Sequence, residues 1–339
     1  MFLYINNLLN GLWFHNRYKF LLIILIPISI LYYILVVIIK LLYKYRVFNK
    51  YYSKLPVIVI GNRSIGGNGK TPITIWLAKY LHDKHKVKIG IVSSGYNSNA
   101  KVPTLVNKDS TTNDVGDEAI ELYKCLSKFA TIISGGNRVA ATKILDHQNN
   151  CEVIIHDDGL QHYHLYSNLV IETNSKDYSK VMNLILPSGP FRDFYNGSFL
   201  EMNQDRINVS FNIDSKKRSE YFFKYDFTLW NSYTDKKLSL NDLNTNKVNL
   251  LTTIADSKNI IKFLEQNNFY VLHSKFPDHY RYTLEDIQFD NDNPVITTMK
   301  DYVKLSELSD NQYYVLSNNI IPNQKFIDLL KTKIEKVIK

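Results

Sequence analysis

Cysteine is scarce in this chain of 339 residues, and its placement excludes two classes of protein. Cys125 and Cys151 are the two cysteines, and neither belongs to a CxxC pair or a Cys/His cluster. This argues against a disulfide framework and a zinc site, and it fits a reducing compartment. Glycine (13) and proline (9) are too few for a fibrous protein, and 45% hydrophobic with 22% charged residues excludes a disordered chain. At roughly 150 residues per domain, the length suggests two domains.

Acidic residues are missing from the start of the chain, where the first of them is Asp83. Ten Lys and Arg residues precede it, so residues 1–82 carry +10, while the remaining 41 − 10 = 31 basic and 32 acidic residues give −1. The net charge of +9 therefore belongs to the N-terminus. We predict no nucleic-acid partner, because the body of the chain is not basic.

Residues 20–39 are one hydrophobic run without a charge, long enough for a helix that crosses the hydrocarbon layer of a membrane. The run exceeds a signal-peptide core, and no small-residue cleavage site follows it. Pro27 can kink the helix, so both a spanning and an interfacial position stay open. Basic residues flank the run and suit an anionic cytoplasmic leaflet: Arg17, Lys19, Lys40, Lys44, Arg46, Lys50 and Lys54. We predict a membrane anchor with a basic collar over residues 1–54.

After Pro56, short apolar strands alternate with amphipathic helices, which is typical of an α/β fold with a parallel sheet. We expect a P-loop NTPase-like α/β/α lobe over residues 55–205, a β-hairpin linker over 206–240 and a second α/β lobe over 241–339. Strands are expected at 57–60, 87–93, 130–134, 153–156, 169–172, 249–254, 270–273, 295–298 and 313–317. Helices are expected at 71–82, 117–127, 138–147, 258–266, 284–287 and 324–338.

The segment 57–72, VIVIGNRSIGGNGKTP, runs from a buried strand through a glycine-rich turn into a helix. Such a loop aims backbone N–H groups at phosphate oxygens, while Lys70 reaches the outer phosphates and the Thr71 hydroxyl can bind Mg²⁺. Ser64 occupies the first glycine position of the GxxxxGK[ST] pattern, but the flanking strand and helix keep the context. We predict a nucleotide site formed by Gly66, Gly67, Asn68, Gly69, Lys70 and Thr71.

Two acidic pairs stand where such a site would need them. Asp157 and Asp158 end a buried strand, where an acidic residue can hold the Mg²⁺ of a P-loop enzyme. Asp-Asp-Gly alone is more often a turn, and the upstream loop makes us favour the metal role. Asp117 and Glu118 begin a helix, where an acid can also serve only as a first-turn partner of the helix dipole.

These motifs together resemble one enzyme family. GNRSIGGNGKTP is similar to the GN-x-T-x-GG-x-GKTP loop of the tetraacyldisaccharide 4′-kinases of lipid A biosynthesis, and further motifs recur in that family's order: VGDEA (115–119), DDGLQH (157–162), LPSGPFR (186–192), FPDH (276–279) and TTMKD (297–301). The resemblance covers essentially the whole chain. It implies transfer of the γ-phosphoryl group of ATP to the 4′-hydroxyl of a tetraacylated glucosamine disaccharide 1-phosphate at the inner face of the cytoplasmic membrane, with no obligate protein partner.

The resemblance also implies roles for individual residues. Lys70 becomes the phosphate lysine and Thr71 a Mg²⁺ ligand. Asp157 and Asp158 belong to the Walker-B-like metal region, Glu118 supports metal or nucleotide, and Asp117 with His279 activates the acceptor hydroxyl. Three positions depart from the family pattern: Ser94 replaces an arginine, Met299 a glutamate and Tyr280 a histidine.

Two other functions are alternatives to the kinase. A membrane-anchored nucleotide switch of the partitioning or targeting type would carry a signature lysine where this chain has Ile65. The second alternative is an anchored structural protein with a vestigial loop. It would not explain why the chain carries Asp117, Asp157 and His279. Four other histidines are expected to be structural or solvent-exposed: His156, His162, His164 and His273.

Overall fold

The structure is a computed structural model that describes residues 13, 20–148, 150–174, 184–193, 205–211, 220–254 and 257–338. The chain forms two compact units, each assembled from separate stretches. Unit 1 combines Met1–Lys70, Arg138–Phe223 and Pro322–Lys339, and unit 2 combines Thr71–Asn137 and Lys224–Ile321. The domain boundaries expected from the sequence stay a prediction. The described residues contain 13 strands in a mixed α/β arrangement.

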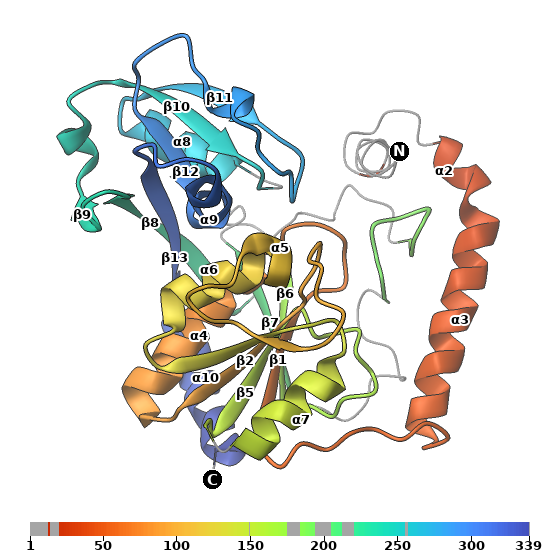
Figure 1. The fold of residues 1–339 in the computed structure, drawn as a ribbon. Helices are drawn as coiled ribbons and strands as arrows, with labels where there is room; N and C mark the ends of the chain where they lie inside the picture. Colours follow the sequence, from red (N-terminus) through yellow and green to blue (C-terminus); the bar gives the residue numbers. More distant parts are fainter. Residues whose placement is uncertain are drawn as a thin grey trace. The chain divides into compact units, whose positions relative to one another are not determined.

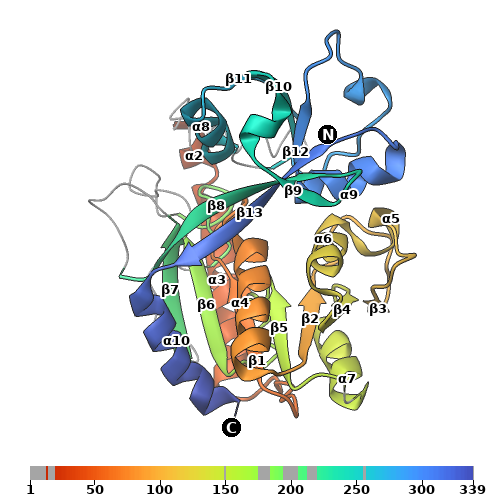
Figure 2. The same cartoon turned by 90° about the vertical axis from the view of Figure 1, so that its left-hand side faces the viewer.

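Unit 1 is built on a parallel sheet in which β1 (Val57–Gly61) pairs with β5 (Val153–Asp157) on one side and β6 (Leu169–Asn174) on the other. Strand β7 (Asp205–Phe211) continues the sheet beside β6, again in parallel. All residues of β1 and β5 are buried, as expected for Val- and Ile-rich strands covered on both faces. Helices α7 (Arg138–Gln148) and α10 (Gln324–Val337) belong to this unit (Figures 1 and 2).

The hydrophobic run near the N-terminus forms two helices, α2 (Phe20–Ile24) and α3 (Ile26–Lys44; Figure 1, red). Pro27 lies in the first turn of α3, where its missing N–H costs no hydrogen bond, so the chain restarts a helix there. The most apolar 18-residue stretch of α3 has a mean hydropathy of 2.2, and 17% of it is buried. The helix is long enough to cross a membrane. It is thus a candidate membrane anchor.

One part of unit 2 surrounds the parallel strands β2 (Ile89–Ser93) and β4 (Ala130–Ser134). The two-residue strand β3 (Thr104–Leu105) pairs antiparallel with β4, and α5 (Thr112–Val115) is a single turn with a capping box. The sequence pattern predicted neither of these short elements. Helix α4 (Lys70–His85) begins directly after the glycine-rich loop. Helix α6 (Asp117–Leu126) follows Gly116, and the φ of 90° at Gly116 ends α5.

The other part of unit 2 is a second parallel set of strands. β10 (Lys247–Thr252) lies between β11 (Tyr270–Lys275) and β12 (Val295–Thr298), and β13 (Tyr314–Pro322) pairs with β12. Apolar clusters lie on both sides of these strands. The helices are α8 (Lys258–Gln266), α9 (Met299–Leu308) and two 3₁₀ turns, η2 (Leu240–Leu243) and η3 (Glu285–Ile287).

The expected antiparallel hairpins over residues 206–240 are correct only for the second pair. β8 (Phe222–Asn231) and β9 (Lys236–Leu238) form an antiparallel hairpin. β7 and β8 instead pair in parallel, with Ser210 opposite Phe222 and Phe211 opposite Phe223. Alternating apolar residues identify a strand with one buried face, but that period is the same for both pairing directions. The alternation therefore located the strands and could not orient them.

Candidate active site

The glycine-rich loop of unit 1 connects β1 to α4, and a side chain would collide with neighbouring residues at Gly61, which ends β1, and at Gly69. A Cβ at Gly61 would lie 2.6 Å from the Cβ of Leu160. Gly69 has a φ of +70°, and a Cβ there would overlap the Phe211 ring. Both the left-handed backbone and the close approach favour glycine. The loop is therefore shaped by packing before any ligand is considered.

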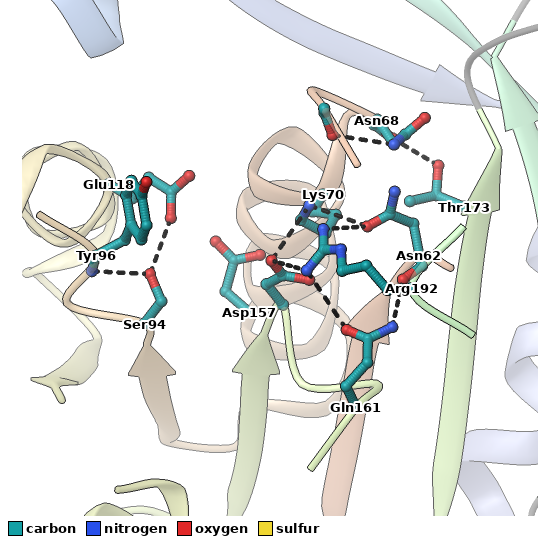
Figure 3. Close-up of polar contacts among 12 residues, drawn as sticks. Asn62, Asn68, Lys70, Ser94, Tyr96, Glu118, Asp157, Gln161, Thr173 and Arg192 are labelled. Carbon is teal, nitrogen blue, oxygen red and sulfur yellow. Dashed lines mark hydrogen bonds and ion pairs between the residues drawn. The ribbon is translucent and has the colours of Figure 1, made fainter. Parts of the chain in front are cut away.

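Hydrogen bonds within the loop explain the serine at the first glycine position of the pattern. The Asn68 amide donates to the Ser64 hydroxyl at 3.1 Å and to the Gly66 carbonyl at 3.0 Å. The Asn62 amide donates to the Ser64 carbonyl at 2.7 Å, and the Thr173 hydroxyl donates to the Asn68 carbonyl at 2.8 Å (Figure 3). Buried side chains thus hold the loop, and Ser64 is one of their acceptors.

Two cations converge on Asp158. Its Oδ2 lies 3.4 Å from the Lys70 Nζ and 3.4 Å from an Arg192 guanidinium nitrogen. Lys70 also donates to Asn62 Oδ1 at 3.1 Å, and Arg192 donates to the Ser64 carbonyl at 3.1 Å. Figure 3 shows Lys70, Arg192, Asn62 and Gln161 pointing toward one another. Such a cluster of donors can bind phosphate oxygens.

Asp158 has the features of a carboxylate that can accept a further ligand. Burial would raise its pKa, but the charges of Lys70, Arg192 and Arg138 outweigh burial and lower the pKa below the ordinary value. Its Oδ1 is buried and has no hydrogen-bond partner within the described part of the chain. The neighbouring Asp157 is 2% exposed at the end of β5, and Arg138 donates to its carbonyl at 2.6 Å.

A second constellation lies in unit 2, where Asp117 and His279 form a hydrogen-bonded pair. The Nδ1 of His279 is 2.9 Å and 3.0 Å from the two carboxylate oxygens of Asp117. Burial would raise the pKa of Asp117, but the hydrogen bond from His279 and the charges of Lys300, His279 and Lys304 hold it well below the ordinary value. Asp117 is therefore ionised at neutral pH, and the imidazole is held in one orientation.

Neighbouring side chains fix this pair in place. Lys300 contacts Asp278 at 2.8 Å and approaches the Nε2 of His279 to 3.5 Å. The ring of Tyr96 packs against His279 with 4.8 Å between centroids. His279 itself has a φ of +58°, a left-handed conformation that a non-glycine residue adopts rarely and that clusters at functional sites. Glu118 accepts a hydrogen bond from Ser94 at 3.3 Å (Figure 3).

The structure thus brings the predicted residues into two local groups. Asn68, Lys70, Asp157 and Asp158 belong to the loop and strand end of unit 1, and Asp117, Glu118 and His279 belong to unit 2. Gly66, Gly67 and Gly69 lie in the loop, and Thr71 is in the first turn of α4. Among the described residues, no group of three or more His, Cys, Asp and Glu side chains could hold a metal ion by itself.

Sequence reasoning missed several polar residues of these groups. Arg192 ends the LPSGPFR motif, which indicates the family but by itself predicts no group that binds phosphate. Asn62 and Gln161 also belong to quoted motifs, and Lys300 belongs to TTMKD. Asn62, Gln161 and Arg192 could have been sought near the carboxyl ends of the strands of unit 1, where open parallel sheets bind ligands.

The four histidines that were expected to be structural or solvent-exposed contact neighbouring side chains of the described structure. His156 is fully buried and lies 3.0 Å from the Thr142 hydroxyl, and His273 lies 3.0 Å from the Thr252 hydroxyl. Arg138 donates to His162 at 3.4 Å, and the His164 ring packs edge-on against His162. Burial foremost, followed by nearby positive groups, lowers the pKa of His162 to about 4.

Comparisons with known proteins agree with one another. The sequence model of the family described as tetraacyldisaccharide-1-P 4′-kinase matches residues 21–335. The tetraacyldisaccharide 4′-kinase of Wigglesworthia glossinidia brevipalpis is 32% identical over 98% of this chain and 90% of its own length, and that of Pasteurella multocida is 31% identical over 86% and 89%. A crystal structure described as LpxK from Aquifex aeolicus in complex with ATP has a TM-score of 0.75 and 25% identity, covering 94% of this chain and all of the other.

Proposed function

The chain belongs to the tetraacyldisaccharide-1-P 4′-kinase family, and from this premise we propose that it transfers the γ-phosphoryl group of ATP to the 4′-hydroxyl of a tetraacylated glucosamine disaccharide 1-phosphate in lipid A biosynthesis. It is a kinase. The observation that carries the proposal is the glycine-rich loop together with Lys70 and Arg192, whose charges meet at Asp158. The chain that contains it matches this family over residues 21–335. A nucleotide switch would have no use for the Asp117–His279 pair.

The loop and the two cations would hold the nucleotide phosphates. Backbone N–H groups of residues 66–69 and the N-terminus of α4 supply donors, and the Lys70 and Arg192 charges would neutralise the outer phosphates. Thr71, Asp157 and Asp158 would hold Mg²⁺, with Glu118 supporting metal or nucleotide. The Oδ1 of Asp158 fits this role because it is buried without a partner in the described structure. The ion would supply charge neutralisation on the transferring phosphoryl group.

Asp117 and His279 would act on the acceptor. A sugar hydroxyl must lose its proton when its oxygen bonds to phosphorus, and the Asp117 carboxylate would accept that proton. Because the Asp117 pKa is low, it is a weak base, which suits a proton that leaves late in a loose transition state. The Nδ1–H of His279 would hold the carboxylate in its reactive orientation.

The finer architecture follows the same proposal. The first α/β/α lobe would be the P-loop lobe, joined through the β8–β9 hairpin region to a second α/β lobe. The α3 helix would keep the enzyme at the cytoplasmic face of the inner membrane, beside the anionic leaflet. A lipid with four acyl chains is practically never free in solution, since each buried CH₂ contributes about 0.8 kcal/mol to membrane binding. The enzyme must therefore meet its acceptor at the interface.

One incubation tests the proposed activity. Purified protein is mixed with Mg-ATP and total lipid precursors, and products are analysed by mass spectrometry. We expect a disaccharide lipid to gain the mass of one phosphate, in a reaction that Lys70→Met protein does not support. Release of inorganic phosphate by hydrolysis of ATP, with no phosphorylated lipid at any ATP concentration, would refute the kinase assignment in favour of an ATPase.

A further inference from the structure

The α3 helix has a buried polar side. Ser29 and Lys40 are each 4% exposed, whereas Ile28, Leu31 and Leu35 are 54%, 66% and 57% exposed. The Ser29 hydroxyl donates to the Ile185 carbonyl at 3.1 Å and accepts from the Ser188 N–H at 2.9 Å. A helix whose only role is to dissolve in lipid has no reason to carry this polar side. Both hydrogen bonds of Ser29 reach one segment of unit 1, residues 184–193.

That segment carries Arg192, and α3 holds it directly. The Tyr32 hydroxyl donates to the Arg192 carbonyl at 3.0 Å. The Arg192 N–H donates to the carbonyl of Arg63 in the glycine-rich loop at 2.6 Å, while its guanidinium approaches Asp158 at 3.4 Å. One hydrogen bond therefore joins the α3 helix to the backbone of Arg192, and the side chain of Arg192 belongs to the cluster with Lys70 and Asp158.

The next residue provides a second attachment. Lys40 forms an ion pair with Asp193, and both side chains are almost fully buried, at 5% and 6% exposure. Asp193 also accepts a hydrogen bond from the Tyr163 hydroxyl at 2.9 Å. A buried ion pair gains little stability over an apolar pair, but it penalises every arrangement that separates its charges. It therefore favours one register of α3 against residues 184–193.

We propose that α3 is a positioning element of the phosphate site as well as a membrane anchor. Tyr32 and Lys40 are positioning residues that hold residues 192–193 so that the Arg192 guanidinium faces Asp158 and the glycine-rich loop. This inference rests on the proposed function, because it takes the cluster around Lys70 to be the ATP site. Its consequence is that loosening α3 weakens ATP binding even where no membrane and no lipid acceptor is present.

Titration of the full-length protein with Mg-ATP in detergent micelles, without lipid acceptor, tests the proposal. Tyr32→Phe removes one neutral hydrogen bond, and we expect roughly five-fold weaker ATP binding, the factor that corresponds to about 1 kcal/mol. Tyr33→Phe is the matched control, since Tyr33 is the next residue on the same helix and is 46% exposed. It should bind ATP as wild type does. Equal affinity in Tyr32→Phe and wild-type protein would overturn the proposal.

A double-mutant cycle separates positioning from general destabilisation. If Tyr32 acts through Arg192, Tyr32→Phe should weaken ATP binding less than two-fold in an Arg192→Ala background, because there is no guanidinium left to position. Losses that multiply would overturn the proposal. Lys40→Met should weaken ATP binding at least as much as Tyr32→Phe does. If Lys40→Met does not fold, the result for Tyr32→Phe alone tests the proposal. Failure of the wild-type protein to bind ATP would instead refute the proposed function.

Discussion

Lys70 is the residue on which the nucleotide assignment depends most. Its ammonium group is held by Asn62 and Asp158 at the start of α4, so it is oriented before a ligand arrives. We predict that Lys70→Ala lowers phosphoryl transfer by at least about two orders of magnitude, the scale of losing one preorganised electrostatic contact. Initial rates with saturating lipid check this, and the thermal midpoint should stay near the wild-type value. Turnover like that of the wild type would remove Lys70 from the site.

Asp117 and His279 allow a sharper test, because residues that act as a unit are not additive. We predict that each single alanine variant loses most of kcat while ATP binding changes little. General-base catalysis contributes typically 10²–10⁴-fold, so the losses lie within assay range. The double variant should be scarcely slower than the poorer single variant. His273→Ala is a control histidine from the same unit and should be nearly active. Multiplicative losses, or an active His279→Ala, would return His279 to a structural role.

The acid–base properties of Asp117 restrict how that pair can be studied. Its folded pKa is lowered, so its ionised form stabilises the folded state above the ordinary carboxyl pKa of about 3.9, and this contribution is lost as pH falls through the folded pKa. Asp117 therefore does not change its charge in assays at neutral or weakly acidic pH. A loss of activity there would have to come from another group.

At the scale of the element, α3 presents two sides with different tasks. The polar side contacts residues 184–193, and the opposite side exposes aliphatic residues to the surroundings. We predict that replacing Leu31, Leu35 and Ile38 by Ser releases the protein from phospholipid vesicles without lowering ATP affinity. The reason is that each buried CH₂ contributes about 0.8 kcal/mol to membrane binding. Vesicle flotation and ATP titration measure the two effects separately.

The matched control for this prediction uses exposed aliphatic residues of unit 2. Leu284 and Ile321 are 58% and 54% exposed, similar to the three residues of α3. Leu284→Ser and Ile321→Ser should float with vesicles as the wild-type protein does. Persistent flotation of the α3 variant would mean that another surface anchors the chain.

At the scale of the whole molecule, buried histidines predict sensitivity to acid. Burial foremost, and the positive charge of Arg138 next, lowers the pKa of both His156 and His162. Because their folded pKa lies below the unfolded value of about 6.5, the unfolded chain binds protons more readily. The free energy of unfolding should therefore be largest above about pH 6.5 and decrease as pH falls below it.

Urea unfolding at pH 7.5 and pH 5 measures this effect. We expect a lower midpoint at pH 5, and a smaller difference between the two values in His156→Gln, whose side chain does not titrate. The glutamine can still bond to the Thr142 hydroxyl, which contacts His156 at 3.0 Å. The contribution of Asp117 stays complete over this interval, since it is lost only in stronger acid. A midpoint independent of pH would contradict the prediction.

Much of the fold was predictable from local pattern. The strands β1, β5 and β6 lie within a residue or two of their predicted ends, because continuous Val and Ile runs bounded by turn residues have few alternatives. The glycine-rich loop was predicted from its motif although Ser64 breaks the pattern. The direction of the β7–β8 pair was missed, since the period of two is the same for both directions.

The sequence by itself determined that an apolar helix precedes an α/β body with a glycine-rich loop between a strand and a helix, because hydrophobic period, charge distribution and glycine spacing are local properties. Only the tertiary structure decided that Arg192 joins Lys70 at Asp158, and that Tyr32 and Lys40 hold the segment from which Arg192 extends. In the sequence Arg192 lies 192 − 70 = 122 positions from Lys70 and 160 from Tyr32, and no local pattern encodes which distant side chains meet. The physical reason is clearest for Lys40 and Asp193: once α3 packs on the body, burying these charges apart would leave both uncompensated, so the arrangement that joins them is favoured.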